Sequence, residues 1–485
     1  MMTREEILAV YEAGPDAVVA LVQSLCAQFE VQVQALNERV RELEIRLGKD
    51  SHNSHKPPSS DGPTFRRPAR KSLRERSGKK PGGQPGHTGR TRLQVDAPDE
   101  VQLHAPGSCA HCGDDLQGVE PCAAQRRQVF DLPPLSLHVR EHQAQSKRCP
   151  GCGHTTQAAF PQGVDEPVQY GAGVLGLGLY LQVYQLLPYG RAAGLIGDLF
   201  GQAPSQGTLA RALEQAHARL EPVEEQIHAG LRRSGSVHFD ETGLRIASER
   251  QWVHSAGTPT LTLYRAHAKR GREAIDAMGV LPGYEGVSIH DAYTSYLSYS
   301  GRHALCNAHL LRDLVAVEEE TQAVWAIAMR GLLMEIKAAA AQARARGAAQ
   351  LEPAQIQAFR ARYDALLREG QAAHPPSPPT GRAGRQKQSP ARNLVMRLQK
   401  HADPVLAFMY DLAVPFDNNL AERDLRMLKT QQKISGGFRS RGGADIFCRI
   451  RSYISTMRKQ CLPLMEALRS VFSQTPLLIP CCGPE

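Results

Sequence analysis

The sequence has no feature of an exported or membrane-spanning protein. Its first ten residues, MMTREEILAV, carry charge from the fourth residue and lack the hydrophobic core of a secretory signal. One uncharged run, residues 167–190, has the length of a membrane span, but it contains three glutamines, four tyrosines and several glycines. We therefore expect a buried helix there, no membrane partner, and a chain that stays in the cytoplasm.

Acidic residues are nearly absent from residues 56–92, where 11 lysines and arginines face only Asp61 and Glu75. This segment alone accounts for the net charge of +9, so the rest of the chain sums to about zero. Such a block, rich in Ser, Pro and Gly, is typical of a disordered arm that meets a polyanion, although a solvated linker has the same composition. Its stretch GKKPGGQPGHTGR lets backbone lie close to phosphates, and its candidate DNA contacts are Lys79, Lys80 and Arg90.

The 485 residues, 41% hydrophobic and 22% charged, are enough for several globular domains. The first of these is a helix, because apolar residues in 17–47 recur at alternating spacings of three and four. Four heptads of this pattern predict a two-stranded coiled coil, and hence a homodimer or higher oligomer, whereas a single amphipathic helix packed on its own domain is the alternative. The repeating positions are Val19, Val22, Cys26, Phe29, Val33, Leu36, Val40, Leu43 and Leu47.

Eleven cysteines, an odd number in a chain without an export signal, favour metal binding or free thiols over a disulfide framework. Two CxxC pairs, CAHCG and CPGCG, are each followed by a glycine that allows a tight left-handed turn. Four thiolates on two such turns predict a tetrahedral zinc site, with a hairpin between the turns. The predicted ligands are Cys109, Cys112, Cys149 and Cys152.

Two kinds of secondary structure follow. Residues 170–222 read as helices around a glycine turn with Ser205 as a cap, which fits a helix-turn-helix and generic helix packing equally well. Residues 234–269 then contain three short β-rich segments, SGSVHFDETGLRIA, QWVHSAG and TLTLYRAHAK, followed by a helix, a strand ending at Asp291 and a strand running into a helix at Asn307. This order predicts a mixed α/β sheet. Helix is expected to about residue 370 and again from Asn393, after a Pro-rich basic loop at 374–392.

Three acids in this region are candidates for metal-dependent chemistry. Asp240 and Asp291 end predicted strands, and Glu422 stands in the first turns of a predicted helix within PFDNNLAERDLRMLK. Taken alone, each acid also fits a turn or an N-capped amphipathic helix. In a mixed sheet the three can converge, and close carboxylates require neutralising cations, for which Mg²⁺ or Mn²⁺ is the natural partner of oxygen ligands. Two such ions clamp a phosphodiester.

Several longer stretches resemble the transposases of the insertion-sequence 66 family. The matching stretches are HFDET, HDAYTSY, LCNAHLLRDL, DNNLAERDLRMLK and GGFRSRGGADIFCRIRSYISTMRKQ, together with PPSSDG, GKKPGGQPGHTG and the paired CxxC turns near the N-terminus. The resemblance covers nearly the whole chain. It implies a DDE transposase with a ribonuclease-H-like core, in which Asp240, Asp291 and Glu422 are the catalytic triad and the four cysteines bind structural zinc.

The resemblance also implies a reaction and its partners. Water attacks at the terminal inverted repeats of the element and frees a 3′-hydroxyl, which then attacks target DNA without a covalent protein–DNA intermediate. DNA is therefore the expected partner, on the bacterial nucleoid, and accessory proteins of the same element are compatible with it. The residues expected to position or bind DNA are Asn418, Asn419, Arg423, Arg426, Arg439 and Arg441, with Arg449 and Arg451 as further candidates. For the last four of these arginines, a solvated charge on a helix or loop is the alternative.

The expected domains follow from these elements: a coiled coil (1–48), a basic arm (49–98), a zinc ribbon (99–165), a helical DNA-binding segment (166–230), a catalytic domain (231–440) with a helical insertion at about 307–414, and a C-terminal helical segment (441–485). Two alternatives remain open. A nuclease or junction resolvase on the same core would cut without joining strands, and a catalytically silent zinc-ribbon protein would only bind DNA. No role is assigned to Cys481 and Cys482.

Overall fold

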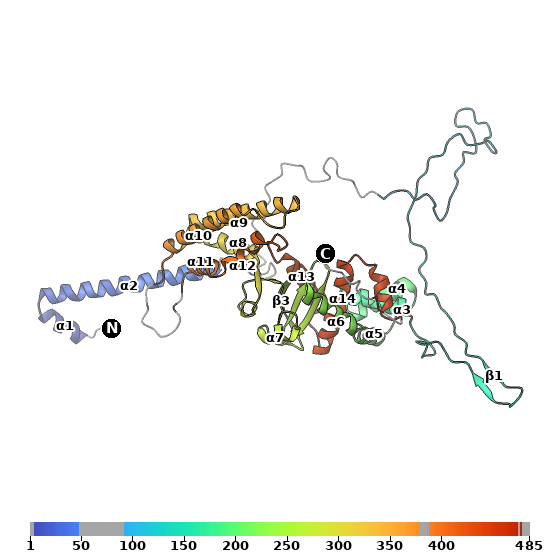
Figure 1. Ribbon diagram of the computed structural model, residues 1–485, viewed down its shortest axis with the longest axis horizontal. Coiled ribbons are helices and arrows are strands. Elements are labelled where there is room, and N and C mark those ends of the chain that lie inside the picture. Colours follow the sequence, from blue (N-terminus) through green and yellow to red (C-terminus); the bar gives the residue numbers. More distant parts are fainter. Residues whose placement is uncertain (1–3, 48–91, 378–385, 387, 474–475, 478–485) are drawn as a thin grey trace.

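The computed structural model describes residues 4–47, 92–377, 386, 388–473 and 476–477. Figure 1 shows a long N-terminal helix, an extended excursion and a body that contains the main sheet and most helices. Within the described part of the chain, no helix has both the length and the apolar character needed to cross a membrane. The basic arm with Lys79, Lys80 and Arg90 lies outside the described residues.

The N-terminal region is helical, as its heptad pattern predicts. A short helix α1 (Arg4–Glu12) precedes the long helix α2 (Pro15–Leu47). Apolar positions of the seam are exposed in the single chain: Phe29 is 67% exposed and Leu36 is 64% exposed. The predicted helix is thus confirmed, whereas its pairing with a second copy stays a prediction.

Residues 92–166 contain little regular structure. Two three-residue strands, β1 (Ser146–Arg148) and β2 (Thr155–Gln157), pair antiparallel across the second CxxC turn. The hairpin predicted between the two turns is wrong, because residues 129–145 form no strand. Two consecutive prolines interrupt that stretch, and its apolar residues have no core to cover: Val129 is 92% exposed and Val139 is 86% exposed.

A helical layer follows, made of α3 (Ala172–Leu179), the π-helix η2 (Tyr180–Tyr184), α4 (Tyr189–Phe200), α5 (Gln206–Arg219) and α6 (Glu221–Arg233). The uncharged run forms the buried helix α3–η2, as expected from its composition. Gly201 ends α4 in the left-handed region, and the Ser205 hydroxyl caps α5 by accepting from the Thr208 amide at 3.0 Å. Both local predictions for this segment are confirmed.

The central sheet has the order β5-β4-β3-β6-β7. Its strands are β3 (Ser236–Ile246), β4 (Glu249–Gly257), β5 (Thr262–His267), β6 (Val287–His290) and β7 (Arg302–Leu305), with α7 (Arg272–Met278) and the 3-10 turn η3 (Tyr296–Ser298) between them. The first three strands form an antiparallel meander, and β6 and β7 extend it in parallel to β3. The predicted mixed sheet is therefore confirmed.

Helices cover both faces of this sheet (Figure 1). On one face, α13 (Asn419–Ser435) and α14 (Arg441–Lys459) enclose a core with α5 and with Leu244, Val253 and Tyr264 of the sheet. On the other face, α6 and α7 pack on Val237 and Phe239 of β3. The short helix α15 (Leu464–Ser470) belongs to the first core.

Further helices lie between β7 and α13, where the insertion was predicted. They are α8 (Asn307–Thr321), α9 (Val324–Ala345), α10 (Pro353–Ala373), α11 (Pro390–Lys400) and α12 (Ala402–Tyr410). Their apolar faces form one core with β6 and β7, in which Ile289 and Leu305 of the strands join Leu314 and Met329 of the helices. The insertion is therefore fixed to the edge of the sheet rather than tethered by a loop.

Candidate active site

Asp240 was predicted to end its strand, but it lies in the middle of β3, because pairing with β4 continues to Ile246. It lies on the face of the sheet that α13 covers. Alternation along the strand gives Asp240 the same face as His238, which contacts the start of α13. Burial raises the pKa of the Asp240 carboxyl well above its ordinary value, and the neighbouring acids Glu241, Asp291 and Glu422 raise it further. Asp240 is thus a desolvated acid in a field of negative charge.

Asp291 is the first residue after β6, as predicted. Because β6 runs parallel to β3, with His238 opposite Ile289, the chain leaves β6 beside the Asp240 carboxyl. The Asp291 carboxylate accepts the Tyr293 amide at 2.9 Å, which closes a tight turn and fixes the side chain. The turn therefore positions a second carboxylate at the same edge of the sheet.

Glu422 lies in the first turn of α13 and pairs with residues of α8. Its Oε1 atom is 3.2 Å from Nε2 of His309 and 3.7 Å from the Arg312 guanidinium. The hydrogen bond from His309 lowers the pKa of Glu422, with the charges of His309, Arg312 and Arg426 acting in the same direction. Glu422 is therefore held as a carboxylate.

Asn418 connects the start of α13 to β3. Its Nδ2 donates to the Phe239 carbonyl at 2.7 Å, and its Oδ1 accepts from Nδ1 of His238 at 2.8 Å. The residue is 2% exposed, and its backbone N–H donates to Sγ of Cys306 at 3.2 Å. Both polar groups of the side chain are bonded inside the protein, so the prediction that Asn418 contacts DNA is wrong. Asn418 instead fixes the start of α13, and with it Glu422, against β3.

The three acids do not form a closed ligand shell in this structure. Among the described residues, the three ligating atoms that come within 4.8 Å of one another belong to Cys306, His309 and Glu422. The mutual effect on the pKa of Asp240 still shows that Asp291 and Glu422 share one electrostatic environment with it. Oxygen donors of this kind fit a hard divalent cation, which would offset their repulsion.

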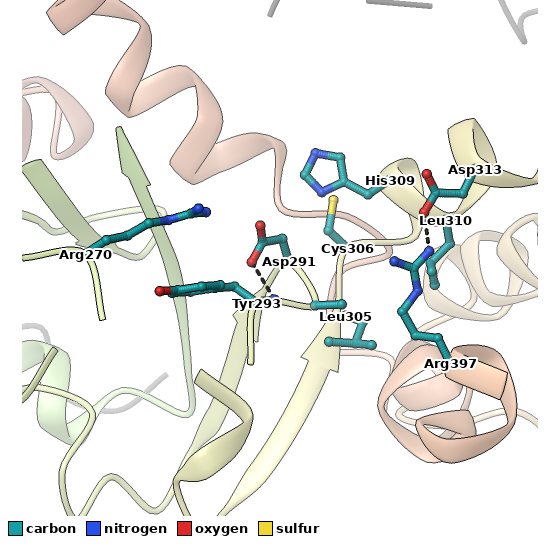
Figure 2. Close-up of a pocket in the computed structure, with 10 residues that line it drawn as sticks. Arg270, Asp291, Tyr293, Leu305, Cys306, His309, Leu310, Asp313 and Arg397 are labelled. Carbon is teal, nitrogen blue, oxygen red and sulfur yellow. Dashed lines mark hydrogen bonds and ion pairs between the residues drawn. The ribbon is translucent and has the colours of Figure 1, made fainter. Parts of the chain in front are cut away.

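A cavity of about 200 Å³ opens beside Asp291. Figure 2 shows Arg270 and Tyr293 on one side of Asp291, and Cys306 and His309 on the other. Asp313 and Arg397 form an ion pair at its far wall. A space bounded by cations and by one candidate catalytic acid is suited to a phosphate-bearing ligand.

Several residues around the three acids were not predicted from the sequence. Glu241, next to Asp240, faces the opposite side of β3, is 2% exposed, and accepts from Nε of Arg270 at 2.8 Å and from the Tyr296 hydroxyl at 2.5 Å. His309 and Cys306 lie in LCNAHLLRDL, where a Cys-x-x-His spacing at a helix start was the available signal. Arg270 had no sequence signal, because it lies in an ordinary turn after β5.

The remaining predicted DNA contacts divide by exposure. Arg441 is 45% exposed and donates to the Ala266 carbonyl at 2.9 Å. Arg449 binds Glu224 and the His217 carbonyl inside the protein, and Arg451 donates to the Val183 carbonyl, so both guanidinium groups are engaged within the chain. The exposed members of the set are Asn419, Arg423, Arg426, Arg439 and Arg441.

The two CxxC turns have the same backbone geometry. In the first, the Cys109 amide donates to the Asp114 carbonyl at 2.8 Å and Gly113 has φ of 81°. In the second, the Cys149 amide donates to the His154 carbonyl at 2.8 Å and Gly153 has φ of 74°. Each turn therefore has the left-handed glycine that the spacing predicts.

Backbone amides within each turn point at the first sulfur. The amides of Cys112 and His111 lower the pKa of Cys109 to about 7, and those of Cys152 and Gly151 lower the pKa of Cys149. Each pair thus fits a thiolate-binding metal. Within the described residues, the two pairs do not come together as one four-sulfur group.

Comparisons with known proteins match three parts of the chain. The model described as "Transposase IS66 family" matches residues 167–446, and the model described as "zinc-finger binding domain of transposase IS66" matches residues 106–153. A "Family of unknown function" matches residues 11–93. A search of curated proteins found no match.

Proposed function

The chain belongs to the transposase IS66 family, and on this premise we propose that it binds the terminal inverted repeats of an insertion sequence and catalyses 3′-end cleavage and strand transfer. The family and the zinc-finger match make DNA its partner. We further propose that the sheet and its helices form a ribonuclease-H-like core, because a three-stranded meander followed by two parallel strands is the arrangement expected of it.

One observation supports the catalytic proposal: three acids from distant parts of the chain lie close enough to affect one another. Asp240 lies on β3, Asp291 follows β6 and Glu422 lies on α13. The charges of Asp291 and Glu422 both raise the pKa of Asp240. Acids gathered at this edge would hold divalent metal, Mg²⁺ or Mn²⁺. Bound there, such ions supply a Lewis acid for the scissile phosphate and an activated nucleophile. The residues that would hold them are the three acids.

The chain's own contribution is position and charge. Asn418 fixes the start of α13 against β3, so Glu422 keeps its place opposite Asp240. His309 and Arg312 keep Glu422 ionised in the absence of cations. In the proposed reaction, water breaks one P–O bond and frees a 3′-hydroxyl; that hydroxyl then attacks a target phosphodiester and displaces a new 3′-hydroxyl.

The other regions take roles consistent with this reaction. We propose that Cys109, Cys112, Cys149 and Cys152 bind one structural Zn²⁺, that the basic arm and the exposed residues around α13 hold the DNA backbone, and that α2 pairs two copies of the chain. The zinc-finger match and the exposed apolar seam of α2 support these roles. Such a protein would act on the bacterial nucleoid.

The test uses full-length protein with a labelled duplex that ends in the element's repeat, with and without Mg²⁺. We expect 3′-end nicking and joining in Mg²⁺, lost at least 100-fold in Asp240→Asn, Asp291→Asn and Glu422→Gln. Asp403→Asn, an acid that is 78% exposed in the insertion, is the matched control and should retain activity.

Each other outcome contradicts part of the proposal. Cutting without joining, and without preference for the repeat, would indicate a nuclease or resolvase. Tight binding without any cleavage, in the presence of the element's other proteins, would indicate a DNA-binding protein whose three acids only shape the fold.

A further inference from the structure

A row of stacked arginine and aromatic side chains extends from β4 toward Asp291. The Arg250 guanidinium lies 5.0 Å from the centre of the Trp252 ring, and the Arg270 guanidinium lies 5.0 Å from the same ring. Arg270 also lies 4.2 Å from the centre of the Tyr293 ring. We call Arg250, Trp252, Arg270 and Tyr293 the aromatic–basic ladder.

The strand register explains why the ladder is continuous. Arg250 and Trp252 are two residues apart on β4 and therefore share one face of the sheet. The residue opposite Trp252 on β3 is Gly243, where a Cβ would come within 3.6 Å of the indole ring. A glycine at this position leaves the indole without a side chain directly opposite it on β3, and Trp252 remains partly exposed beside the two guanidinium groups.

A buried acid fixes the inner end of the ladder. Glu241, on the same face of β3 as Gly243, accepts from Nε of Arg270 at 2.8 Å and is 2% exposed. The ion pair orients the guanidinium between the indole and the phenol ring, while Arg270 itself remains 40% exposed. The stacking geometry therefore exists before any ligand binds.

The aromatic–basic ladder lies between two cavities, and one of its ends lines each of them. Its outer end, Arg250, lines a cavity of about 380 Å³ together with Arg245 and Lys429, and no acid lines that cavity. Its inner end, Arg270 and Tyr293, lines the cavity beside Asp291 (Figure 2). A polyanion that enters between the three cations would therefore be led along the rings toward Asp291.

We propose that the aromatic–basic ladder binds unpaired nucleotides of a DNA strand, with phosphates in the Arg245–Arg250–Lys429 cavity and a base stacked on Trp252. This inference rests on the proposed function, since it specifies the form in which the DNA end reaches Asp291. Unpaired bases expose the faces that stack on aromatic and guanidinium groups, whereas a duplex hides them. The charge of the outer cavity complements the phosphates.

The chain has a built-in probe for this interaction. Its two tryptophans are Trp252, which is partly exposed, and Trp325, which is 3% exposed inside the insertion. In full-length Trp325→Phe, without added divalent cations, an oligothymidylate strand should quench the fluorescence of Trp252. The same strand should leave the fluorescence of Trp252→Phe, which reports Trp325, unchanged.

Affinity is measured with the same strand carrying a fluorescent label. Trp252→Ala should weaken binding of the single strand by about tenfold and leave binding of a blunt duplex within about twofold. Arg250→Gln should weaken it several-fold and reduce the salt dependence, whereas Arg346→Gln, an exposed arginine after α9, should change neither. Trp252→Phe, which keeps a ring in the sheet, serves if Trp252→Ala does not fold.

The inference is overturned if the oligothymidylate does not quench Trp252, or if the ladder variants weaken duplex and single strand equally. Its failure is distinct from that of the proposed function, because nicking that depends on Asp240, Asp291 and Glu422 would persist with an inert ladder. Conversely, quenching and selective loss of single-strand binding support the ladder even in a chain that cuts nothing.

Discussion

The Nε2 atom of His309 lies 3.2 Å from Oε1 of Glu422, and this contact joins the first turn of α8 to the first turn of α13. The two carboxyls at either side of the site consequently differ in charge state. His309 lowers the pKa of Glu422, while burial raises the pKa of Asp240. The site therefore combines one acid whose pKa is lowered with one acid whose pKa is raised, and a cation bound between them would lower the pKa of the second.

His309→Ala should reduce Mg²⁺-dependent nicking about 10- to 100-fold, because Glu422 loses the group that orients it. The measurement is the nicking rate across Mg²⁺ concentration, where loss of orientation also raises the Mg²⁺ concentration required. His228→Ala on α6 is the matched control. An unchanged Mg²⁺ requirement in His309→Ala would show that the contact is only structural.

Asp240→Asn should raise the thermal midpoint of the metal-free protein, because it replaces an acid whose ionisation is opposed by burial and by three other acids with a side chain that does not ionise. Mg²⁺ should raise the midpoint of the wild type by about 2–4 °C and leave that of the variant unchanged. Differential scanning calorimetry measures both. An equal response to Mg²⁺ in the two proteins would place the cation elsewhere.

The adjacent residues Asn418 and Asn419 should separate into a structural and a surface role. Asn418→Ala leaves two buried partners unsatisfied and should cost about 1–3 kcal/mol of unfolding free energy. Asn419→Ala, at an exposed position, should change stability by less than about 0.5 kcal/mol. Denaturant titration of both variants is the measurement, and equal costs would contradict the assigned role of Asn418.

Stability should fall as the pH falls below neutrality. Burial lowers the pKa of His254 and of His290 to about 4. The unfolded chain binds their protons near pH 6.5, so it holds more protons than the folded chain between pH 6.5 and 4, and the free energy of unfolding decreases as pH falls through that window. Each histidine contributes at most about 3 kcal/mol to this loss.

Urea titrations at pH 7 and pH 5 measure the effect. His254→Gln, which keeps a polar side chain near the Lys269 carbonyl but does not titrate, should show a smaller difference between the two pH values than the wild type. His104→Gln, at an exposed position, is the control for the loss of a histidine. The same difference in all three proteins would contradict the prediction.

Purified protein should carry one zinc ion per chain. Cys149→Ser should release it, because one thiolate of four is lost, whereas Cys122→Ser should retain it, because this exposed cysteine lies outside both turns. Metal analysis after gel filtration gives the stoichiometry. Retention of zinc by Cys149→Ser would mean that the two CxxC pairs do not share one ion.

Local signals predicted much of the fold. The Ser205 cap, the strand that ends before Asp291 and the helix predicted at residues 17–47 each depend on residues within a few positions, and each is confirmed in the structure. The hairpin between the CxxC turns failed because alternation alone does not form a strand without a surface to cover. Sequence pattern thus served best where a buried face enforced it.

The site was predicted only in part, because its remaining members meet through contacts distant in sequence. Glu422 and His309 are separated by the whole insertion, and Arg270 reaches Glu241 from a turn after β5. Asn418 was expected to position DNA from the family resemblance, yet the return of the chain to β3 buries it. Such roles depend on tertiary structure that no local pattern encodes.

The two ends of the insertion meet at one point. The backbone N–H of Asn307 donates to the Phe416 carbonyl at 3.2 Å, and the backbone N–H of Asn418 donates to Sγ of Cys306 at 3.2 Å. A segment closed in this way can gain or lose length at its far side, in the turn between α8 and α9, where Val324 is 76% exposed, without altering the path that brings Glu422 to β3. Lineages of this family can therefore diversify there while keeping one reaction, and a reporter grafted into that turn would leave the chemistry intact.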